Sequence, residues 1–350
     1  MNDMSQYGAS ANAVRQYAND CLGGIAGRPV NYIECRIDES SAAAGTDCAN
    51  RVVEGKAAAL VITSTTLGQV IVPIVTGAGI PYVGVNPVSP AESTDKSGLV
   101  FELSPGAAGY LAAMAKLAKD GGMKKVGLVV TENAAQGIGS LAKIPFGNAG
   151  VELHLVTVPP GTPDMTAQVT SALSGAGAVG LIGDQTQCIS FLQALESLDP
   201  DGQHWILRGC TETKVLKAAG AESVDKARIF TTSETTSGSA EALLYRQVMA
   251  KYAPETSAEG GAVIGYQAAF GFLRAIEGIK GDITSRSVAS TLGASRNIAL
   301  PAGAGTTFGC AERPIKMFTT VCSSQVIVGT MRDATATDPK PVDVASLLAN

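Results

Sequence analysis

The chain has 350 residues and a formal net charge of −5, and 45% of its residues are hydrophobic against 16% charged. At roughly 150 residues per domain, this length suggests two domains, each large enough to bury its own core. The acidic balance, with no Lys/Arg run, argues against a nucleic-acid partner, because phosphate binding needs a basic surface. No apolar stretch is long enough to span a bilayer. The composition therefore indicates a globular protein of about two domains.

Short apolar segments of β type alternate with amphipathic helical segments in the first part of the chain, which is the pattern of a parallel α/β sheet. We expect strands at Val30–Ile37, Ala58–Ile62, Pro81–Val85 and Val100–Leu103. We expect helices at Ala9–Cys21, Asp47–Gly55 and Leu67–Ala78.

The alternation then restarts and predicts a second sheet. After a helix at Ala107–Lys119, strands are expected at Lys125–Val130, Val151–Val158, Ala178–Ile182, His204–Leu207 and Arg228–Thr232. Helices are expected next at Ala240–Tyr252, Glu259–Ile279 and Ser285–Leu292. Near the end, Lys316–Val321 and Gln325–Val328 resemble an antiparallel pair closed around Cys322.

Seven cysteines are unusual for a cytosolic chain kept reduced. Spacing suggests three disulfides, although a set of reduced core thiols is the alternative. The candidate pairs are Cys35 with Cys48, Cys188 with Cys210, and Cys310 with Cys322. Cys21 is left over and follows Val14 and Tyr17 at helical spacing, which predicts a buried apolar thiol. Disulfides would place the protein in an oxidising, extracytoplasmic compartment.

Two stretches imitate a dinucleotide-binding fingerprint. Gly175–Gly180 precedes a strand, whereas the fingerprint must follow one and open a helix. Gly137–Ala142 is placed better, but the next strand, Val151–Val158, ends without the acidic residue that would hold a ribose. No cofactor is expected.

Catalytic and metal-binding motifs are scarce. The sequence has no G-x-S-x-G, P-loop or HExxH motif, and the histidines are isolated. Loop acids after predicted strands, Glu132, Asp184 and Glu212, leave a carboxylate-based hydrolase open. Solvated loop acids explain them equally well, so we expect neither an enzyme nor a metal site.

Polar residues gather where open α/β sheets place their ligands, at the carboxyl ends of strands. Thr63-Ser64-Thr65-Thr66 follows one strand and leads into a helix. Hydroxyls and free backbone N–H groups at a helix start suit a carboxylate. An ordinary Ser/Thr helix cap is the alternative.

Taken together, these segments resemble the type I periplasmic binding proteins of the ABC importers for branched-chain amino acids, amides and aromatic acids. The resemblance covers nearly the whole chain and rests on order and spacing. The segments that carry it are Gln6-Tyr7-Gly8, the turn from Gly23 to Pro29, the strand before Asp38, Cys48 to Val53, and Gly79 to Val83 ahead of Asn86-Pro87.

The resemblance implies an α/β fold of two doubly wound parallel-sheet lobes, the type I periplasmic binding protein fold, joined by a three-crossing hinge. The first lobe would comprise residues 1–104 with 233–308, and the second 105–232 with 309–350. A small organic solute would bind in the cleft between them. Matching position by position, the implied ligand-binding residues are Tyr7, Ser64, Thr65, Thr66, Pro87, Ser89, Gln136, Asp184, Gln185, Thr211 and Glu212.

Two departures from the family's pattern stand out. Amino-acid-binding members carry an acidic residue where this chain has Thr211, with Glu212 one place away. A ligand ammonium facing Thr211 would lack its counter-charge. An amide, urea-like solute, hydroxy acid or aromatic carboxylate then competes with an amino acid, and Asp184 could still supply a charge. Family members also begin with a central strand and an export signal, so Met1 is expected to be an internal or misassigned start.

The sequence thus predicts an extracytoplasmic substrate-binding protein that closes around its solute and hands it to the permease of an ABC importer. We expect a monomer that binds neither nucleic acid nor, except through the permease or an anchor, membrane. A ligand-sensing regulator on the same fold is the main alternative, and an α/β enzyme is a third.

Overall fold

A computed structural model describes residues 5–199 and 201–349, so the expectation about Met1 lies outside the described residues. The chain forms two compact units and passes between them three times. Unit 1 comprises Met1–Gly106 and Ser237–Ser324, and unit 2 comprises Ala107–Thr236 and Gln325–Asn350. Residues 309–324 thus belong to unit 1, whereas the sequence analysis gave them to the second lobe. They join unit 1 because the backbone around Val321 forms a bridge with Glu102 and Cys322 lies in the core of this unit.

Unit 1 carries a parallel sheet in the order β1-β2-β3. Its strands are β1 (Leu60–Val61), β2 (Tyr82–Gly84) and β3 (Val100–Glu102), with a separate antiparallel pair of β9 (Ile298–Ala299) and β10 (Thr307–Phe308). Its helices are α1 (Ser5–Cys21), α2 (Ala42–Glu54), α3 (Gly68–Gly77), α4 (Pro90–Thr94), α10 (Ala240–Tyr252), α11 (Ala262–Ile276) and α12 (Ser285–Ala294).

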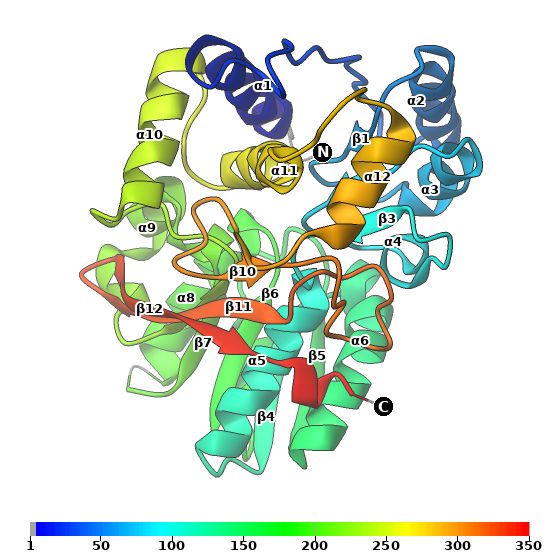
Figure 1. Ribbon diagram of the computed structural model, residues 1–350. Coiled ribbons are helices and arrows are strands. Elements are labelled where there is room, and N and C mark those ends of the chain that lie inside the picture. Colours follow the sequence, from blue (N-terminus) through cyan, green and yellow to red (C-terminus); the bar gives the residue numbers. More distant parts are fainter. Residues whose placement is uncertain (1–4, 200, 350) are drawn as a thin grey trace. The chain divides into compact units, whose positions relative to one another are not determined.

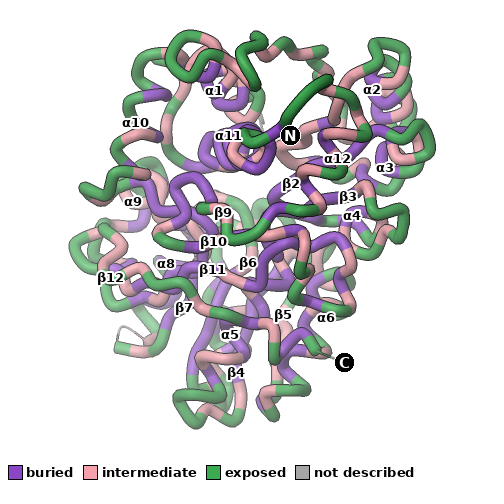
Figure 2. Tube along the Cα trace, viewed as in Figure 1, coloured by how far each residue is buried: buried purple, intermediate pink, exposed green. Residues whose placement is uncertain are grey.

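Alternating side chains of these strands divide between two cores, as the pleat of a strand requires. Tyr82 and Val100 pack with residues of α2 and α3. Val83 and Phe101 point to the opposite face and pack with α11 and α12. Figure 2 shows α11 as a largely buried helix, which accounts for its nearly unbroken apolar sequence. The sheet of unit 1 is therefore covered on both faces.

The structure corrects two of the predicted strands. The segment Val30–Ile37 forms no strand and pairs with no strand among the described residues. A β-strand exists only through backbone bonds to a neighbour, and an apolar run cannot supply that partner by itself. The second error is Lys316–Val321, which forms turns. Its expected partner, which begins at Gln325, pairs elsewhere, in unit 2.

Unit 2 is a larger sheet, seven-stranded within the described residues, in the order β12-β11-β8-β7-β6-β4-β5. The strands are β4 (Lys125–Thr131), β5 (Glu152–Val158), β6 (Ala178–Ile182), β7 (His204–Leu207), β8 (Arg228–Thr231), β11 (Gln325–Arg332) and β12 (Thr335–Asp343). The helices are α5 (Gly106–Asp120), α6 (Glu132–Ala149), α7 (Thr166–Leu173), α8 (Gln185–Leu198) and α9 (Thr213–Ala219), with short 3-10 turns η1 (Arg208–Thr211), η2 (Ala221–Val224) and η3 (Ala345–Leu347).

The strand order of unit 2 fixes where its helices lie. From β4 the chain moves outward to β5 through α6, and then in the opposite direction to β6, β7 and β8 through α7, α8 and α9. Right-handed crossovers in opposite directions place helices on opposite faces. The core that includes Val179, Phe191 and Val215 accordingly joins the strands to α7, α8 and α9, while α5 and α6 lie in front of the green strands in Figure 1. Strands β5, β4, β6, β7 and β8 thus form the predicted doubly wound parallel sheet, and β11 and β12 add an antiparallel pair at one edge.

All three expected disulfides are present in the described residues. They join Cys35 to Cys48, Cys188 to Cys210, and Cys310 to Cys322. Cys21 corrects the prediction of a buried thiol, because it is exposed. It belongs to the last turn of α1, beyond the buried positions of that helix, which end at Ala18.

No helix in the described part of the chain combines the length and the hydropathy needed to cross a bilayer.

Candidate ligand-binding site

Two loops of unit 1 leave neighbouring parallel strands at the same edge of the sheet and lead into helices. The loop after β1 contains Thr63 to Thr66 and runs into α3, and the loop after β2 contains Pro87 to Ser89 and runs into α4. Parallel strands bring their carboxyl ends together, which is where such sheets bind ligands. The predicted residues of these two loops therefore share one edge of the sheet.

Thr65 and Thr66 bind a carboxylate of the chain itself, that of Glu39. The Thr65 hydroxyl lies 3.0 Å from Oε1 of Glu39, and the Thr66 hydroxyl lies 2.7 Å from Oε2. The backbone N–H of Thr66 donates to Oε2 at 2.6 Å. The predicted combination of hydroxyls and a backbone amide is thus assembled, and a carboxylate is the group it holds. Ser64 is half-buried and its hydroxyl makes no hydrogen bond with the rest of the described chain.

Ser89 is the N-cap of α4 and forms a capping box with Glu92. The Ser89 hydroxyl accepts from the Glu92 N–H at 3.3 Å, and the Glu92 carboxylate accepts from the Ser89 N–H at 2.9 Å. The hydroxyl of Tyr82 donates to the other oxygen of Glu92 at 2.5 Å. Burial first, and then the charge of Glu92, raise the pKa of Tyr82 well above its usual value. Ser89 is buried in this network, so its predicted role as a ligand contact stays a prediction.

The starts of α3 and α4 touch each other at Gly68. A Cβ at Gly68 would lie 2.6 Å from the hydroxyl of Ser89, which is closer than a side chain tolerates. The Ala91 N–H also donates to the side-chain oxygen of Gln69 at 3.3 Å. Glycine at this position therefore allows the carboxylate-binding loop and the Ser89 loop to approach.

In unit 2, the loops after β6 and β7 are joined by a hydrogen bond between Gln185 and Glu212. Gln185 is in the first turn of α8, and Glu212 precedes α9. Asp184 caps α8, where its carboxylate accepts from the N–H of Gln187 at 3.0 Å. The hydroxyl of Thr211 donates to the carbonyl oxygen of Arg208 at 2.9 Å. Four of the residues predicted in the second lobe therefore have partners within the chain. Asp184 and Thr211 bond the local backbone, and Gln185 and Glu212 bond each other.

Arg208 provides a cation at the end of β7 that the sequence analysis did not single out. Its guanidinium donates to the hydroxyls of Ser233 at 3.2 Å and Thr235 at 2.7 Å, which follow β8. Tyr110 belongs to the same environment, because burial raises its pKa while Arg208 lowers it. The carboxyl ends of β7 and β8 are therefore tied together by a positive charge.

The remaining predicted residues are not joined to these groups. The ring of Tyr7 packs against Gly261 at the start of α11, so a side chain there would overlap it. Pro87 is buried beside Gly106, whereas Gln136 is exposed on α6. The helix that carries Gln136 also begins earlier than predicted. Because α6 begins at Glu132, Gly137–Ala142 lies inside the helix and not at its start.

The chain matches the profile of the periplasmic binding proteins over residues 3–321. It belongs to that family. This membership identifies a solute-binding protein rather than an enzyme and implies an extracytoplasmic location, in agreement with the three disulfides. No curated protein gave a significant sequence match.

Solved structures share the fold of this periplasmic binding protein over nearly its whole length. A leucine-binding protein from Thermotoga maritima is 19% identical with a TM-score of 0.71, and the match covers 98% of this chain and 96% of that one. A branched-chain amino acid ABC transporter protein from Thermus thermophilus with bound valine has 16% identity and a TM-score of 0.80, covering 98% and 93%. A fatty acid ABC transporter substrate-binding protein from Thermomonospora curvata has 14% identity and a TM-score of 0.71, covering 97% and 87%.

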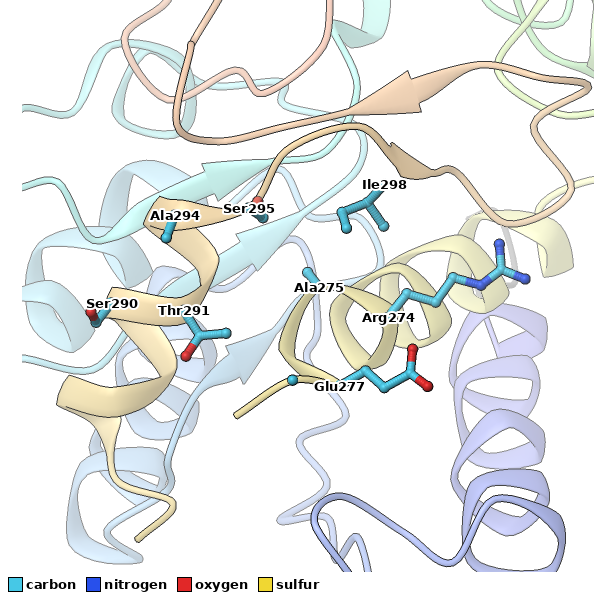
Figure 3. Close-up of a pocket in the computed structure, with 9 residues that line it drawn as sticks. Arg274, Ala275, Glu277, Ser290, Thr291, Ala294, Ser295 and Ile298 are labelled. Atoms are coloured by element: carbon cyan, nitrogen blue, oxygen red, sulfur yellow. The ribbon is translucent and has the colours of Figure 1, made fainter. Parts of the chain in front are cut away.

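A surface depression of about 620 Å³ lies elsewhere on unit 1, between α11 and α12 (Figure 3). Arg274 and Glu277 line one side, and Ser290, Thr291 and Ala294 line the other. The guanidinium of Arg274 already pairs with Glu241 at 2.7 Å. None of the predicted ligand residues is among the described residues that line it, so we do not assign the solute to this depression.

Sequence reasoning missed Glu39, Glu92 and Arg208 in this periplasmic binding protein. Glu92 carries a readable signal, because Ser89 followed three residues later by Glu is a capping box. Glu39 precedes α2 and meets the threonines only through the tertiary fold. No local pattern marks it.

Proposed function

We propose that this chain is the substrate-binding protein of an ABC importer and that its solute carries a carboxylate, bound by Thr65 and Thr66. The observation that supports this most directly is the hydrogen bonding of these two residues to a carboxylate through two hydroxyls and one N–H. Charge-assisted bonds of this kind are roughly twice as strong as neutral ones. The start of α3 adds its positive dipole end.

The solutes of the structural relatives support the same chemical group. These relatives are described as proteins for leucine, valine and fatty acid, and all three solutes carry a carboxylate while their remaining parts differ. In this chain, the carboxylate of Glu212 is bonded to the Gln185 amide, and the described residues offer it no cationic partner. Glu212 could therefore compensate a ligand ammonium despite the neutral Thr211. Amino acids come first in the proposed class, ahead of acids without an amino group.

Uptake would proceed by domain closure. The solute would dock on Thr65 and Thr66 in unit 1, and binding would shift the protein toward a closed population in which unit 2 adds its contacts. Gln136, Asp184 and Glu212 are the proposed contributors from unit 2. The permease would recognise the closed form. Small-angle scattering tests this step, because ligand should reduce the radius of gyration, and an unchanged radius at saturation would contradict closure.

A thermal-shift screen followed by calorimetry tests the proposed ligand class. A ligand that binds only the folded protein raises the melting temperature by mass action. Leucine, valine, octanoate and their uncharged amides form the informative set, and we expect the acids to bind and the amides to bind more weakly.

The Thr65→Val/Thr66→Ala double variant should weaken binding of the best acid by about 10-fold to 100-fold, because two hydrogen bonds to a charged group are removed. Thr65→Ser keeps the hydroxyl and should restore most of the affinity. The matched control is Thr76→Val in α3, the helix that follows these threonines, where the hydroxyl bonds only the carbonyl of Val72. Equal affinity in the double variant and the wild type would rule out this site.

A further inference from the structure

We propose that Glu39 is a specificity-determining residue that competes with the ligand carboxylate for Thr65 and Thr66. This inference rests on the proposed carboxylate site and concerns its regulation. It predicts that an acidic solute enters only when the Glu39 side chain leaves.

Glu39 engages three donors at this site, the two threonine hydroxyls and the backbone N–H of Thr66. Each threonine hydroxyl has one proton, and the backbone of Thr66 has one N–H. The Thr65 hydroxyl, the Thr66 hydroxyl and the Thr66 N–H all point to the Glu39 carboxylate, at 3.0, 2.7 and 2.6 Å. A second carboxylate would find these three donors already occupied.

Electrostatic repulsion further disfavours simultaneous binding of Glu39 and a ligand carboxylate. Glu39, Glu92 and Glu102 all raise the pKa of Tyr82, after the larger effect of its burial, which places three carboxylates near one buried ring. A ligand carboxylate that arrived beside a resident Glu39 would place two negative charges at the same donors. Like charges in a partly desolvated site repel, so the two anions exclude each other.

The chain holds Glu39 close to the threonines by a covalent constraint. Glu39 belongs to the loop that the Cys35–Cys48 disulfide closes, which spans a sequence separation of 13. The loop turns at Asp38, whose carbonyl accepts from the N–H of Ser41 at 2.9 Å, and Ser41 then caps α2. A tethered carboxylate has a high effective concentration at the site. The apparent affinity for an acidic solute is then reduced by the fraction of molecules in which the site is open.

The Glu39→Gln variant tests this competition, and Asp38→Asn is its matched control. Both changes remove one negative charge from the same turn, but the Asp38 carboxylate bonds only Ser40, at 2.7 Å and 3.0 Å. We expect E39Q to bind leucine, valine or octanoate about 10-fold more tightly than the wild type, and D38N to stay within about 2-fold. Leucinamide, which lacks the carboxylate, should gain nothing. Weaker or unchanged acid binding by E39Q would overturn the proposal, as would an equal gain for the amide.

Hydrogen exchange in the ligand-free protein provides a readout that needs no ligand. The Thr66 amide should be protected in the wild type and in D38N, and should exchange at least 10-fold faster in Glu39→Ala. Equal exchange in all three proteins would overturn the proposal. If none of the acids binds the wild type or E39Q while the difference in exchange is observed, the proposed carboxylate solute fails and the occupancy of the site by Glu39 stands.

Discussion

Glu102 lies directly opposite Gly84 in the parallel register of β2 and β3, and its carboxylate occupies the space that a side chain at Gly84 would need. Glu102 is fully buried, and neither of its carboxylate oxygens has a hydrogen-bond partner in the described structure. Burial, and to a lesser degree the nearby charge of Glu92, raise its pKa well above the usual value. The folded protein therefore holds a neutral carboxyl group in the core of unit 1.

Glu102→Gln should change how stability depends on pH. Above about pH 4.5 the carboxyl is ionised in the unfolded chain but still protonated in the folded protein, so the wild type loses stability as pH rises. Relative to E102Q, the wild type should lose free energy of unfolding by at most about 1.4 kcal/mol per pH unit. Urea unfolding at pH 5, 6.5 and 8 measures it. Parallel stability curves for the two proteins would contradict a neutral Glu102.

Glu92→Gln is the matched contrast, because Glu92 accepts hydrogen bonds from Tyr82, Val88 and Ser89. A glutamine amide accepts hydrogen bonds only through its oxygen, because its nitrogen is a donor. E92Q should therefore destabilise the protein by about 1–3 kcal/mol at pH 7.

Gly84→Ala should destabilise unit 1 by about 1–3 kcal/mol, because its Cβ would lie 2.6 Å from Oε1 of Glu102. Glu102→Ala in the same chain should recover part of the loss by removing the obstructing carboxylate. Gly137→Ala is the control, since nothing lies within 4 Å of its Cβ position in α6 and the helix should gain up to about 1 kcal/mol. Additive effects of G84A and E102A in a double-mutant cycle would show that the two residues do not interact.

His204 should make unit 2 less stable in mild acid. Burial lowers the pKa of His204, and this outweighs the opposite effect of Asp199. As pH falls below about 6.5, the unfolded chain takes up a proton that the folded imidazole resists, so stability falls with pH. His204→Gln should reduce the difference between unfolding at pH 7.5 and pH 5.5. Asp199→Asn should enlarge it, and a smaller difference in D199N would show that the direction is wrong.

The Cys188–Cys210 disulfide links α8 to the turn after β7 across a sequence separation of 22. Replacing both cysteines by alanine should lower the free energy of unfolding by about 2–4 kcal/mol, because the unfolded chain regains its freedom. Cys21→Ser should have no comparable effect, since this thiol is exposed and free. Calorimetry of the oxidised proteins measures both. A melting temperature of the double variant equal to that of the wild type would exclude a structural role for the bond.

Local pattern was sufficient where a segment's own residues determine its structure. The apolar runs at Ala178–Ile182 and His204–Leu207 form the predicted strands, and both strands are central in the sheet of unit 2. The three cysteine pairs were readable from their short separations. The polar turn at Thr65 and Thr66 was recognisable as either a helix cap or a carboxylate-binding sequence before its geometry was known.

The sequence by itself therefore determined the α/β alternation, the family and the donors at the end of β1. Tertiary structure alone decided that Val30–Ile37 finds no strand partner within residues 5–199 and 201–349, that Gln325 pairs in unit 2, and that Glu39 reaches Thr65 and Thr66. The physical reason is the same in each case. Hydrogen bonds between distant residues depend on which segments the fold brings together, and no local propensity or spacing contains that information.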